Sequence, residues 1–257
     1  MNIQELFNIK GKTAIVTGGG RGLGEQMALA LAEAGANVVV CSRKLEACQE
    51  VSDRLVNLGV RSMALACDVQ NLDEINFVVQ KTLEEFGSID ILVNNSGTGW
   101  VAPALEMKPD KWDFVMDVNL KSIFLFCQAV GKVMVEQGSG KIINIASVTG
   151  FGGQDPKIMD TICYSTSKGA LINFTKDLAV KLAPSNVHVN AIAPGFFPTK
   201  MTKGMEDNDK ILDRTPMGRY GSEFDMKGPA LFLASSASDY VTGHVLLVDG
   251  GLVAQVV

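Results

Sequence analysis

Tyr164 and Lys168 are the two residues of this 257-residue chain whose types and spacing best suit proton transfer. They stand four positions apart at the start of a predicted helix that runs to Leu182, so their side chains share one helix face. A tyrosine has an ordinary pKa of about 10, and a nearby ammonium stabilises its phenolate. To act as a base near neutral pH, the phenol needs about 4 kcal/mol of such stabilisation. The pair predicts a general acid or base, although the same spacing also arises by chance in helices without that role.

Ser147 and Asn119 carry polar groups at positions where chemistry can use them. Ser147 stands two residues past the predicted strand Lys141–Ile145. Its hydroxyl there can donate to a carbonyl oxygen as negative charge builds up, or it can cap its own turn. Asn119 falls inside the apolar stripe of the predicted helix Trp112–Val135. Because a buried amide needs hydrogen-bond partners, Asn119 is either a satisfied core residue or an organiser of water and backbone.

A glycine-rich turn joins the predicted strand Thr13–Thr17 to the predicted helix Leu23–Ala34. Glycine lets backbone N–H groups approach a phosphate closely, and the helix N-terminus adds partial positive charge. The turn therefore predicts a dinucleotide site, with a turn that binds nothing as the alternative. Its expected contacts are Gly18, Gly20, Arg21, Gly22, Leu23 and Gly24.

The end of the second predicted strand indicates which dinucleotide is bound. A free ribose 2′-hydroxyl is usually met by an Asp or Glu there, but this strand ends Cys41-Ser42-Arg43. Arg21 lies within the glycine turn, and two guanidinium groups suit a 2′-phosphate. We therefore expect NADP(H), with Ser42 and Arg43 among its contacts. The alternative is that Arg43 is only a solvated charge at the strand end.

Short apolar runs alternate with helical patterns along the whole chain. Such runs, without polar alternation, are typical of parallel strands buried on both faces. The predicted strands are Thr13–Thr17, Asn37–Cys41, Met63–Cys67, Ile89–Val93, Lys141–Ile145, Val187–Ile192 and Val245–Val248. Further helices are expected over Leu45–Leu58, Ile75–Phe86 and Ala170–Leu182. The pattern predicts the α/β class, a doubly wound (Rossmann), mostly parallel seven-stranded sheet with helices on both faces.

No linker or repeat divides the sequence, so residues 1–257 are expected to form a single dinucleotide-binding and catalytic domain. Two long connections interrupt the alternation, at about 149–163 and 196–220. Ligands of such sheets bind beyond the carboxyl ends of the strands, and both connections leave from those ends. They are the expected walls of a substrate pocket.

Composition excludes several functional classes. There are 23 Lys and Arg against 28 Asp and Glu, a net charge of −5, without the basic cluster of a nucleic-acid-binding protein. No uninterrupted apolar run reaches the roughly 18 residues of a membrane span, and Met1–Glu5 does not resemble a signal peptide. The histidines His188 and His244 stand alone, so no metal site is expected. The odd number of cysteines, without a C-x-x-C pair, suggests reduced thiols in a cytoplasmic protein: Cys41, Cys48, Cys67, Cys127 and Cys163.

Taken together, these residues resemble the short-chain dehydrogenase/reductase family in its classical branch, from Gly11 to Gly251. The resemblance rests on Thr17-Gly18…Gly22-Leu23-Gly24, Asp68-Val69, Asn94-Asn95-Ser96-Gly97, Asn119, Ser147, Tyr164…Lys168, Pro194-Gly195 and Val248-Asp249-Gly250-Gly251. It implies an enzyme that interconverts a ketone and a secondary alcohol, because the cofactor transfers hydride and the protein supplies the proton.

The resemblance also implies a role for each matching position. Tyr164 would be the acid in reduction and the base in oxidation, while Lys168 would lower its pKa and hold the nicotinamide ribose. Ser147 would polarise the carbonyl, and Asn119 would hold a water of a proton relay. The further cofactor contacts would be Asp68 and Val69 at the adenine, Asn94 and Gly97 along the adenosine, and Ile192, Pro194, Gly195 and Thr199 at the nicotinamide.

The substrate remains open between two classes. The sequence resembles family members that act as gluconate 5-dehydrogenases or as 3-oxoacyl thioester reductases. Lys157, Lys200 and Lys203 in the two long connections suit an anionic sugar acid, whereas an acyl carrier would need a basic patch at the pocket mouth. The remote alternative to an enzyme is a non-catalytic NADP-binding regulatory protein.

The resemblance also implies an oligomeric state. It implies a homotetramer in which Trp112–Val135 and Tyr164–Leu182 pack across a two-fold axis. The sequence also departs from the family, because Ser147 and Tyr164 are 17 positions apart, more than in many members. Ser96 replaces the usual alanine. The extra residues of the longer spacing fall in 149–163. Since this connection is an expected wall of the substrate pocket, the resemblance does not predict the shape of the pocket.

Overall fold

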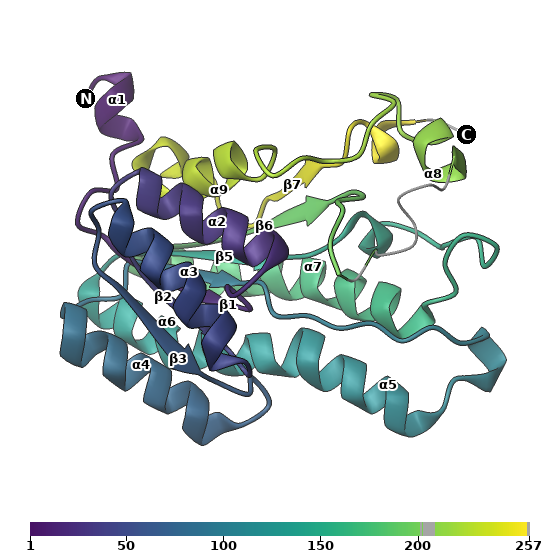
Figure 1. Ribbon diagram of the computed structural model, residues 1–257, viewed down its shortest axis with the longest axis horizontal. Helices are drawn as coiled ribbons and strands as arrows, with labels where there is room; N and C mark the ends of the chain where they lie inside the picture. Colours follow the sequence, from purple (N-terminus) through teal and green to yellow (C-terminus); the bar gives the residue numbers. More distant parts are fainter. Residues whose placement is uncertain (201, 203–208, 256–257) are drawn as a thin grey trace.

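The computed structural model describes residues 1–200, 202 and 209–255. In that part of the chain, seven strands form one sheet in the order β3-β2-β1-β4-β5-β6-β7 (Figure 1). Every neighbouring pair is parallel. The strands are β1 (Thr13–Thr17), β2 (Asn37–Ser42), β3 (Ser62–Ala66), β4 (Ile91–Asn94), β5 (Gly140–Ile145), β6 (Val187–Pro194) and β7 (Val245–Val248). The predicted doubly wound fold is confirmed.

The strand ends differ slightly from the sequence prediction. β4 begins at Ile91 instead of Ile89, and β6 continues to Pro194 instead of ending at Ile192. Just before β4, the Asp90 carboxylate accepts hydrogen bonds from the Thr13 amide and the Lys12 ammonium. Such shifts at element ends are expected from hydrophobic pattern alone.

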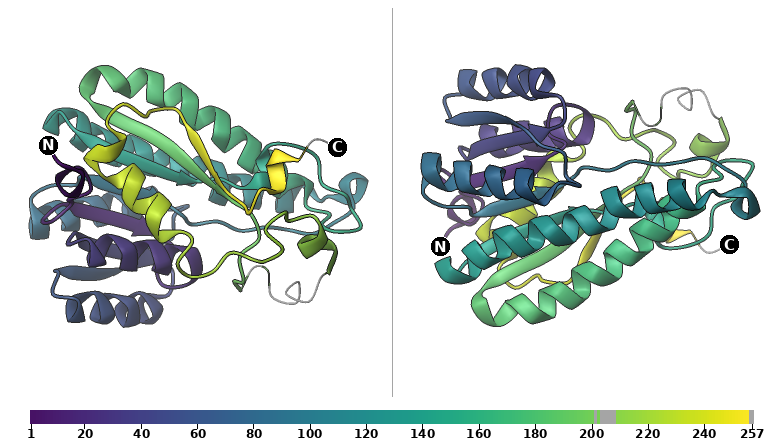
Figure 2. Two further views of the ribbon diagram at one scale, coloured as in Figure 1. Left: turned by 90° about the horizontal axis from the view of Figure 1, so that it is seen from above. Right: turned by 90° about the horizontal axis from the view of Figure 1, so that it is seen from below.

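Two apolar layers cover the sheet. On one face, α2 (Gly22–Glu33), α3 (Leu45–Asn57) and α9 (Lys227–Ala234) bury side chains such as Met27, Leu55 and Leu233. On the other face, α4 (Leu72–Phe86), α6 (Ser122–Gln137) and α7 (Ile162–Leu182) bury Val78, Phe126 and Leu171. Figure 2 shows α7 running alongside α6.

The predicted helix Trp112–Val135 is divided into three pieces. These are α5 (Pro109–Met116), a π-helical turn over Asp117–Lys121 and α6. Pro109 suits the first turn of α5, and Gly138 ends α6 in the left-handed conformation. The run Pro109–Gln137 is long and apolar enough to cross a membrane by composition, but half of its most apolar window is buried inside the protein. That burial is typical of a core helix.

Several short helices have little sequence signal. Besides α1 (Ile3–Leu6) and α8 (Asp209–Asp213), the described chain has 3-10 turns at Ala104–Glu106, Val148–Gly150, Ala183–Ser185, Ser236–Ser238 and Leu252–Ala254. The eight-residue α9 was also not predicted, because Gly228 and Pro229 in its first turn read as a loop.

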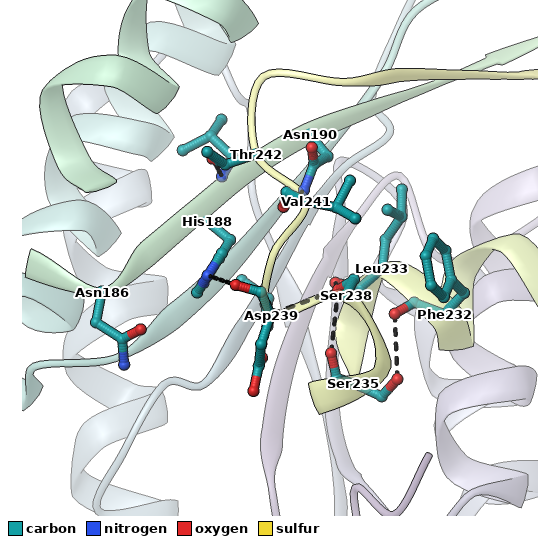
Figure 3. A network of polar contacts seen from close by, with 12 residues as sticks. Asn186, His188, Asn190, Phe232, Leu233, Ser235, Ser238, Asp239, Val241 and Thr242 are labelled. Carbon is teal, nitrogen blue, oxygen red and sulfur yellow. Dashed lines mark hydrogen bonds and ion pairs between the residues drawn. The ribbon is translucent and has the colours of Figure 1, made fainter. Parts of the chain in front are cut away.

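The two histidines lie at the end of the sheet where β6 begins. His188 is the second residue of β6, and its Nε2 lies 2.8 Å from the carbonyl oxygen of Asp239 (Figure 3). The amide of His244 donates to Asn190 Oδ1, and Asn190 Nδ2 donates to the carbonyl of Val241. These contacts tie β6 to the segment before β7, so the local partners of both histidines are structural.

Candidate active site

Tyr164 lies in the first turn of α7, facing the end of β5. Its ring is half-buried, and its hydroxyl forms a hydrogen bond with Ser147, which follows β5 and is 7% exposed. Ser147 Oγ also accepts hydrogen bonds from the amide and hydroxyl of Thr149. Ser147 therefore caps its own turn and also faces the phenol, while its donation to a substrate carbonyl remains a prediction.

Lys168 stands one helical turn beyond Tyr164 and is buried, with 3% exposure. Its ammonium donates a 2.6 Å hydrogen bond to the carbonyl of Ile145 and lies 5.6 Å from the centroid of the Tyr164 ring. Burial lowers the pKa of Lys168 to about 8. The i, i+4 spacing thus places the phenol and the ammonium near each other, as predicted. The fold brings both to the end of β5.

The electrostatics of Tyr164 in this structure differ from the expectation that Lys168 lowers its pKa. Burial raises the pKa of Tyr164, and the hydrogen bond with Ser147 lowers it in part. Since Lys168 points to the Ile145 carbonyl, desolvation has the larger effect on the phenol. In this geometry Tyr164 holds its proton at neutral pH, which is the state needed to donate to a carbonyl oxygen.

Asn119 lies in the π-helical turn and is fully buried. Its Oδ1 accepts a 2.8 Å hydrogen bond from the Thr98 amide, and its Nδ2 donates to the Thr98 carbonyl and to Ser167 Oγ. Ser167 in turn donates to the carbonyl of Tyr164. Asn119 is therefore a satisfied core amide that links the segment after β4 to the turn bearing Tyr164.

The segment after β4 passes directly beside Tyr164 and Lys168. A Cβ placed on Gly97 would lie 3.8 Å from the Lys168 ammonium, and one on Gly99 would lie 3.8 Å from Cδ2 of Tyr164. Thr98, between them, is held by Asn119. Thr98, Gly99 and Ser167 were not singled out from the sequence, because only the fold brings them next to Tyr164.

The glycine turn is held in a conformation that residues with side chains rarely adopt. Gly18 and Gly22 have φ values of +63° and +57°. A Cβ on Gly24 would lie 2.4 Å from both Asn95 Nδ2 and the carbonyl oxygen of Gly18. Asn95 Nδ2 donates to the carbonyls of Thr17 and Gly18, so Asn95 braces the turn. Asn95 belongs to the motif quoted from the sequence, but a cofactor contact was expected of Asn94 and no separate role of Asn95.

Asn94 has a different environment from the one expected. Its side chain is 1% exposed, and its Nδ2 donates to Asn144 Oδ1 at 2.9 Å and lies 3.3 Å from Cys127 Sγ. The side chain therefore belongs to the core on the α6 and α7 side. Any contact of Asn94 with the adenosine would have to be made by its backbone.

The segment after β6 approaches the glycine turn from the other side. A Cβ on Gly22 would lie 3.7 Å from Cγ2 of Thr199. Pro194 ends β6, and the Gly195 amide donates to the carbonyl of Val248. A Cβ on Gly195 would lie 2.8 Å from the Cα of Asp249, so glycine permits this close approach. The predicted contacts at the two ends of the dinucleotide are thereby brought to one edge of the sheet.

The predicted adenosine contacts gather at the ends of β2 and β3. Ser42 ends β2 and accepts a hydrogen bond from the Lys44 amide, while the neighbouring Arg43 is exposed. Asp68 and the buried Val69 follow β3, and Asp68 Oδ1 accepts from the Gln70 amide. Arg21 precedes α2, and its exposed side chain makes no hydrogen bond to the helix end.

These residues fit a dinucleotide. The N-terminus of the twelve-residue α2 has no side-chain cap, and Gly22 presents no side chain. The exposed guanidinium groups of Arg21 and Arg43 stand at the start of α2 and just past the end of β2. The uncapped backbone N–H groups at this helix N-terminus suit a pyrophosphate. Among the described residues, no group of three or more His, Cys, Asp or Glu side chains could hold a metal ion.

Comparisons with known proteins agree with this site. A family model described as short chain dehydrogenase matches residues 12–210. The chain is 42% identical to a 2-dehydro-3-deoxy-D-gluconate 5-dehydrogenase of Dickeya dadantii, over 98% of this chain and all of that protein. It is 40% identical to a 3-oxoacyl-[acyl-carrier-protein] reductase of Chlamydia muridarum, over 94% of this chain and 97% of that protein.

A solved structure is similar over nearly the whole chain. It is a gluconate 5-dehydrogenase from Burkholderia cenocepacia in complex with NADP and tartrate, at 36% identity and a TM-score of 0.93. The alignment covers 99% of this chain and all of that one. The chain belongs to the short-chain dehydrogenase family and is an oxidoreductase of that class. The predicted family and enzyme class are confirmed.

Proposed function

We propose that this chain is an NADP(H)-dependent oxidoreductase that interconverts a ketone and a secondary alcohol of a sugar acid. The observation that carries the reaction class is the arrangement of Tyr164, Ser147 and Lys168 beside the segment that follows β4. NADPH, when bound, supplies the hydride in reduction. The protein then has to orient the carbonyl and deliver one proton to its oxygen.

Each residue of the site has a defined task in this proposal. Tyr164 donates its phenolic proton to the carbonyl oxygen, and Ser147 donates a hydrogen bond to the same oxygen as charge builds up on it. Lys168 holds positive charge beside the phenol and orients the cofactor ribose. Asn119 keeps Thr98 and Ser167 in place, and its role as the holder of a relay water remains a prediction.

NADP(H) is proposed over NAD(H) because of charge. Arg21 and Arg43 are both exposed, and no acid ends β2. The cofactor prediction agrees with the NADP bound in the Burkholderia enzyme. Gly18, Gly20, Gly22, Leu23 and Gly24 would hold the pyrophosphate, and Pro194, Gly195 and Thr199 the nicotinamide end.

A sugar acid is the proposed substrate class for two reasons. The Dickeya and Burkholderia relatives are named for gluconate-type substrates, and the latter holds tartrate, a hydroxy acid. The two long connections also carry exposed lysines, Lys157 and Lys200, which suit an anionic substrate. Lys203, also expected there, lies outside the described residues. The alternative is a 3-oxoacyl thioester, the substrate class in the name of the Chlamydia relative.

A substrate panel separates these classes. Purified protein should oxidise NADPH with 5-keto-D-gluconate and related keto acids, and should do so at least tenfold more efficiently than with a 3-oxoacyl thioester. NADH should be the poorer cofactor. A higher kcat/KM for the thioester would favour the second class, and binding of NADPH without turnover of any ketone would favour the regulatory reading.

We also propose that the chain acts as a single-domain homotetramer in the cytoplasm. A groove of about 470 Å³ on the outer face of the α5–α6 run and α7 is lined by apolar side chains, among them Leu120, Phe124 and Phe174. Phe124 is 46% exposed, which suits a face covered by a second copy. The five cysteines are free and buried, which suits a reducing compartment. Sedimentation equilibrium tests the tetramer.

A further inference from the structure

The connection between β5 and α7 is fixed at both ends beside the catalytic residues. At its start, a Cβ on Gly150 would lie 2.8 Å from the carbonyl carbon of Lys168, so the chain packs directly on α7 there. At its end, Thr161 forms a parallel bridge with Ala102, and the Ala102 amide donates to the Asp160 carbonyl at 3.1 Å. Thr161 is three residues before Tyr164. A shift of residues 151–160 would therefore also shift the first turn of α7, which carries the phenol of Tyr164.

Asp155 organises the middle of this connection. Its Oδ1 accepts a 3.0 Å hydrogen bond from the Lys157 amide, and its carbonyl accepts from the amides of Ile158 and Met159. This turn fixes the direction of the carboxylate and occupies one of its oxygens. The other oxygen, Oδ2, lies 3.6 Å from the guanidinium of Arg214.

Arg214 belongs to the second long connection, between β6 and α9. It follows α8, and its carbonyl oxygen accepts a hydrogen bond from Gln255 Nε2 near the end of the chain. The next residue, Thr215, is 7% exposed and donates through its hydroxyl to the Ile211 carbonyl. The backbone that carries the guanidinium is therefore anchored independently of Asp155.

We propose that Asp155 and Arg214 form an ion pair that fastens the two connections to each other at the carboxyl end of the sheet, and that they act as positioning residues for the substrate. The inference rests on the proposed function, because only the proposed function makes these two connections the walls of a substrate pocket. Asp155 and Arg214 lie 59 positions apart in sequence (214 − 155) and come from connections that leave different strands. Joining them reduces the freedom of residues 151–160 before substrate binds.

The size of the expected effect follows from exposure. The Arg214 and Asp155 side chains are 56% and 38% exposed, so solvent screens the pair. An ion pair of this kind changes an equilibrium by about two- to fivefold. Loss of the pair should raise KM for the substrate by that factor and leave kcat nearly unchanged, because neither residue reaches the reacting atoms.

The test uses Asp155→Asn, Arg214→Gln and the double variant. Asparagine keeps the acceptor for the Lys157 amide while removing the charge, so the turn is preserved. Lys181→Gln is the matched control, since it removes an exposed ion pair with Asp177 at the far end of α7. Two quantities are measured: the rate of tryptic cleavage after Lys157, followed by fragment mass, and KM and kcat with saturating NADPH.

Each single variant should be cleaved after Lys157 two- to fivefold faster than the wild type, and the double variant no faster than either single one. KM should rise by a similar factor. Cleavage rates equal to those of Lys181→Gln, or effects that multiply in the double variant, would overturn the proposal. Wild-type protein that turns over no substrate would contradict the proposed function instead, and the cleavage measurement would still decide the ion pair.

Discussion

Lys168 Nζ donates a 2.6 Å hydrogen bond to the carbonyl oxygen of Ile145, the last residue of β5. The bond joins α7 to the strand end from which Ser147 follows. The ammonium is buried, and the loss of solvent lowers its pKa to about 8. Its charge state therefore changes close to neutral pH, which is typical of groups at functional sites.

The rate of ketone reduction should be level below about pH 8 and fall above it. Lys168 loses its proton in that range, whereas the raised pKa of Tyr164 keeps the proton donor intact. The measurement is kcat/KM with NADPH from pH 6 to 10, with circular dichroism at each pH to verify the fold. A rate that stays level or rises from pH 8 to 10 would contradict the assignment.

Stability should depend on pH through the same group. The pKa of Lys168 is about 8 in the folded protein and about 10.4 in an unfolded chain. Between these values the unfolded chain binds more protons, so the free energy of unfolding rises with pH, by at most about 1.4 kcal/mol per pH unit from this group. Urea denaturation of wild type and Lys168→Met at pH 7.5 and 9.5 isolates the contribution. Parallel changes in the two proteins would show that Lys168 does not carry it.

Replacing Asn119 with alanine should destabilise the protein by about 2–4 kcal/mol, because the amide and carbonyl of Thr98 lose their partners inside the protein. Turnover should fall as well, since Ser167 and the Tyr164 backbone lose support. Urea unfolding gives the first quantity and steady-state kinetics the second. Asn76→Ala, at an exposed position of α4, is the control. Equal stability of the two variants would show that the hydrogen bonds of Asn119 to Thr98 do not stabilise the fold.

Gly24→Ala should weaken NADPH binding at least tenfold. The added Cβ would stand 2.4 Å from Asn95 Nδ2 and the Gly18 carbonyl, so the phosphate turn has to move. Gly228→Ala is the matched control, because that position of α9 is exposed and has nothing within 4 Å of an added Cβ. Fluorescence titration with NADPH compares them. Unchanged affinity in Gly24→Ala would mean that the turn does not hold the cofactor.

Much of the fold could be predicted because its strands are short, apolar and buried on both faces. A run such as Ile142–Ile145 permits few other structures, and the spacing of Tyr164 and Lys168 already places them on one helix face. The π-helical turn around Asn119 could not be predicted, because an apolar stripe near 3.6 residues reads as one continuous helix. A single extra residue in a turn leaves little trace in such a pattern.

The neighbouring residues Asn94 and Asn95 show a second limit of sequence reading. Successive side chains of a strand point to opposite faces, so the exact strand end decides which amide faces the core and which faces the glycine turn. The predicted end of β4 was one residue early. Contacts between distant loops, such as Asp155 with Arg214, have no periodic signal at all and emerge only from the folded chain.

The most direct test of the account is the activity of Tyr164→Phe, which removes one hydroxyl and keeps the ring. Reduction should slow by roughly 10²–10⁴-fold, while the dissociation constant of NADPH stays within about twofold of wild type. If the variant reduces the same ketone at the wild-type rate, the proton does not come from Tyr164, and the proposed mechanism is wrong.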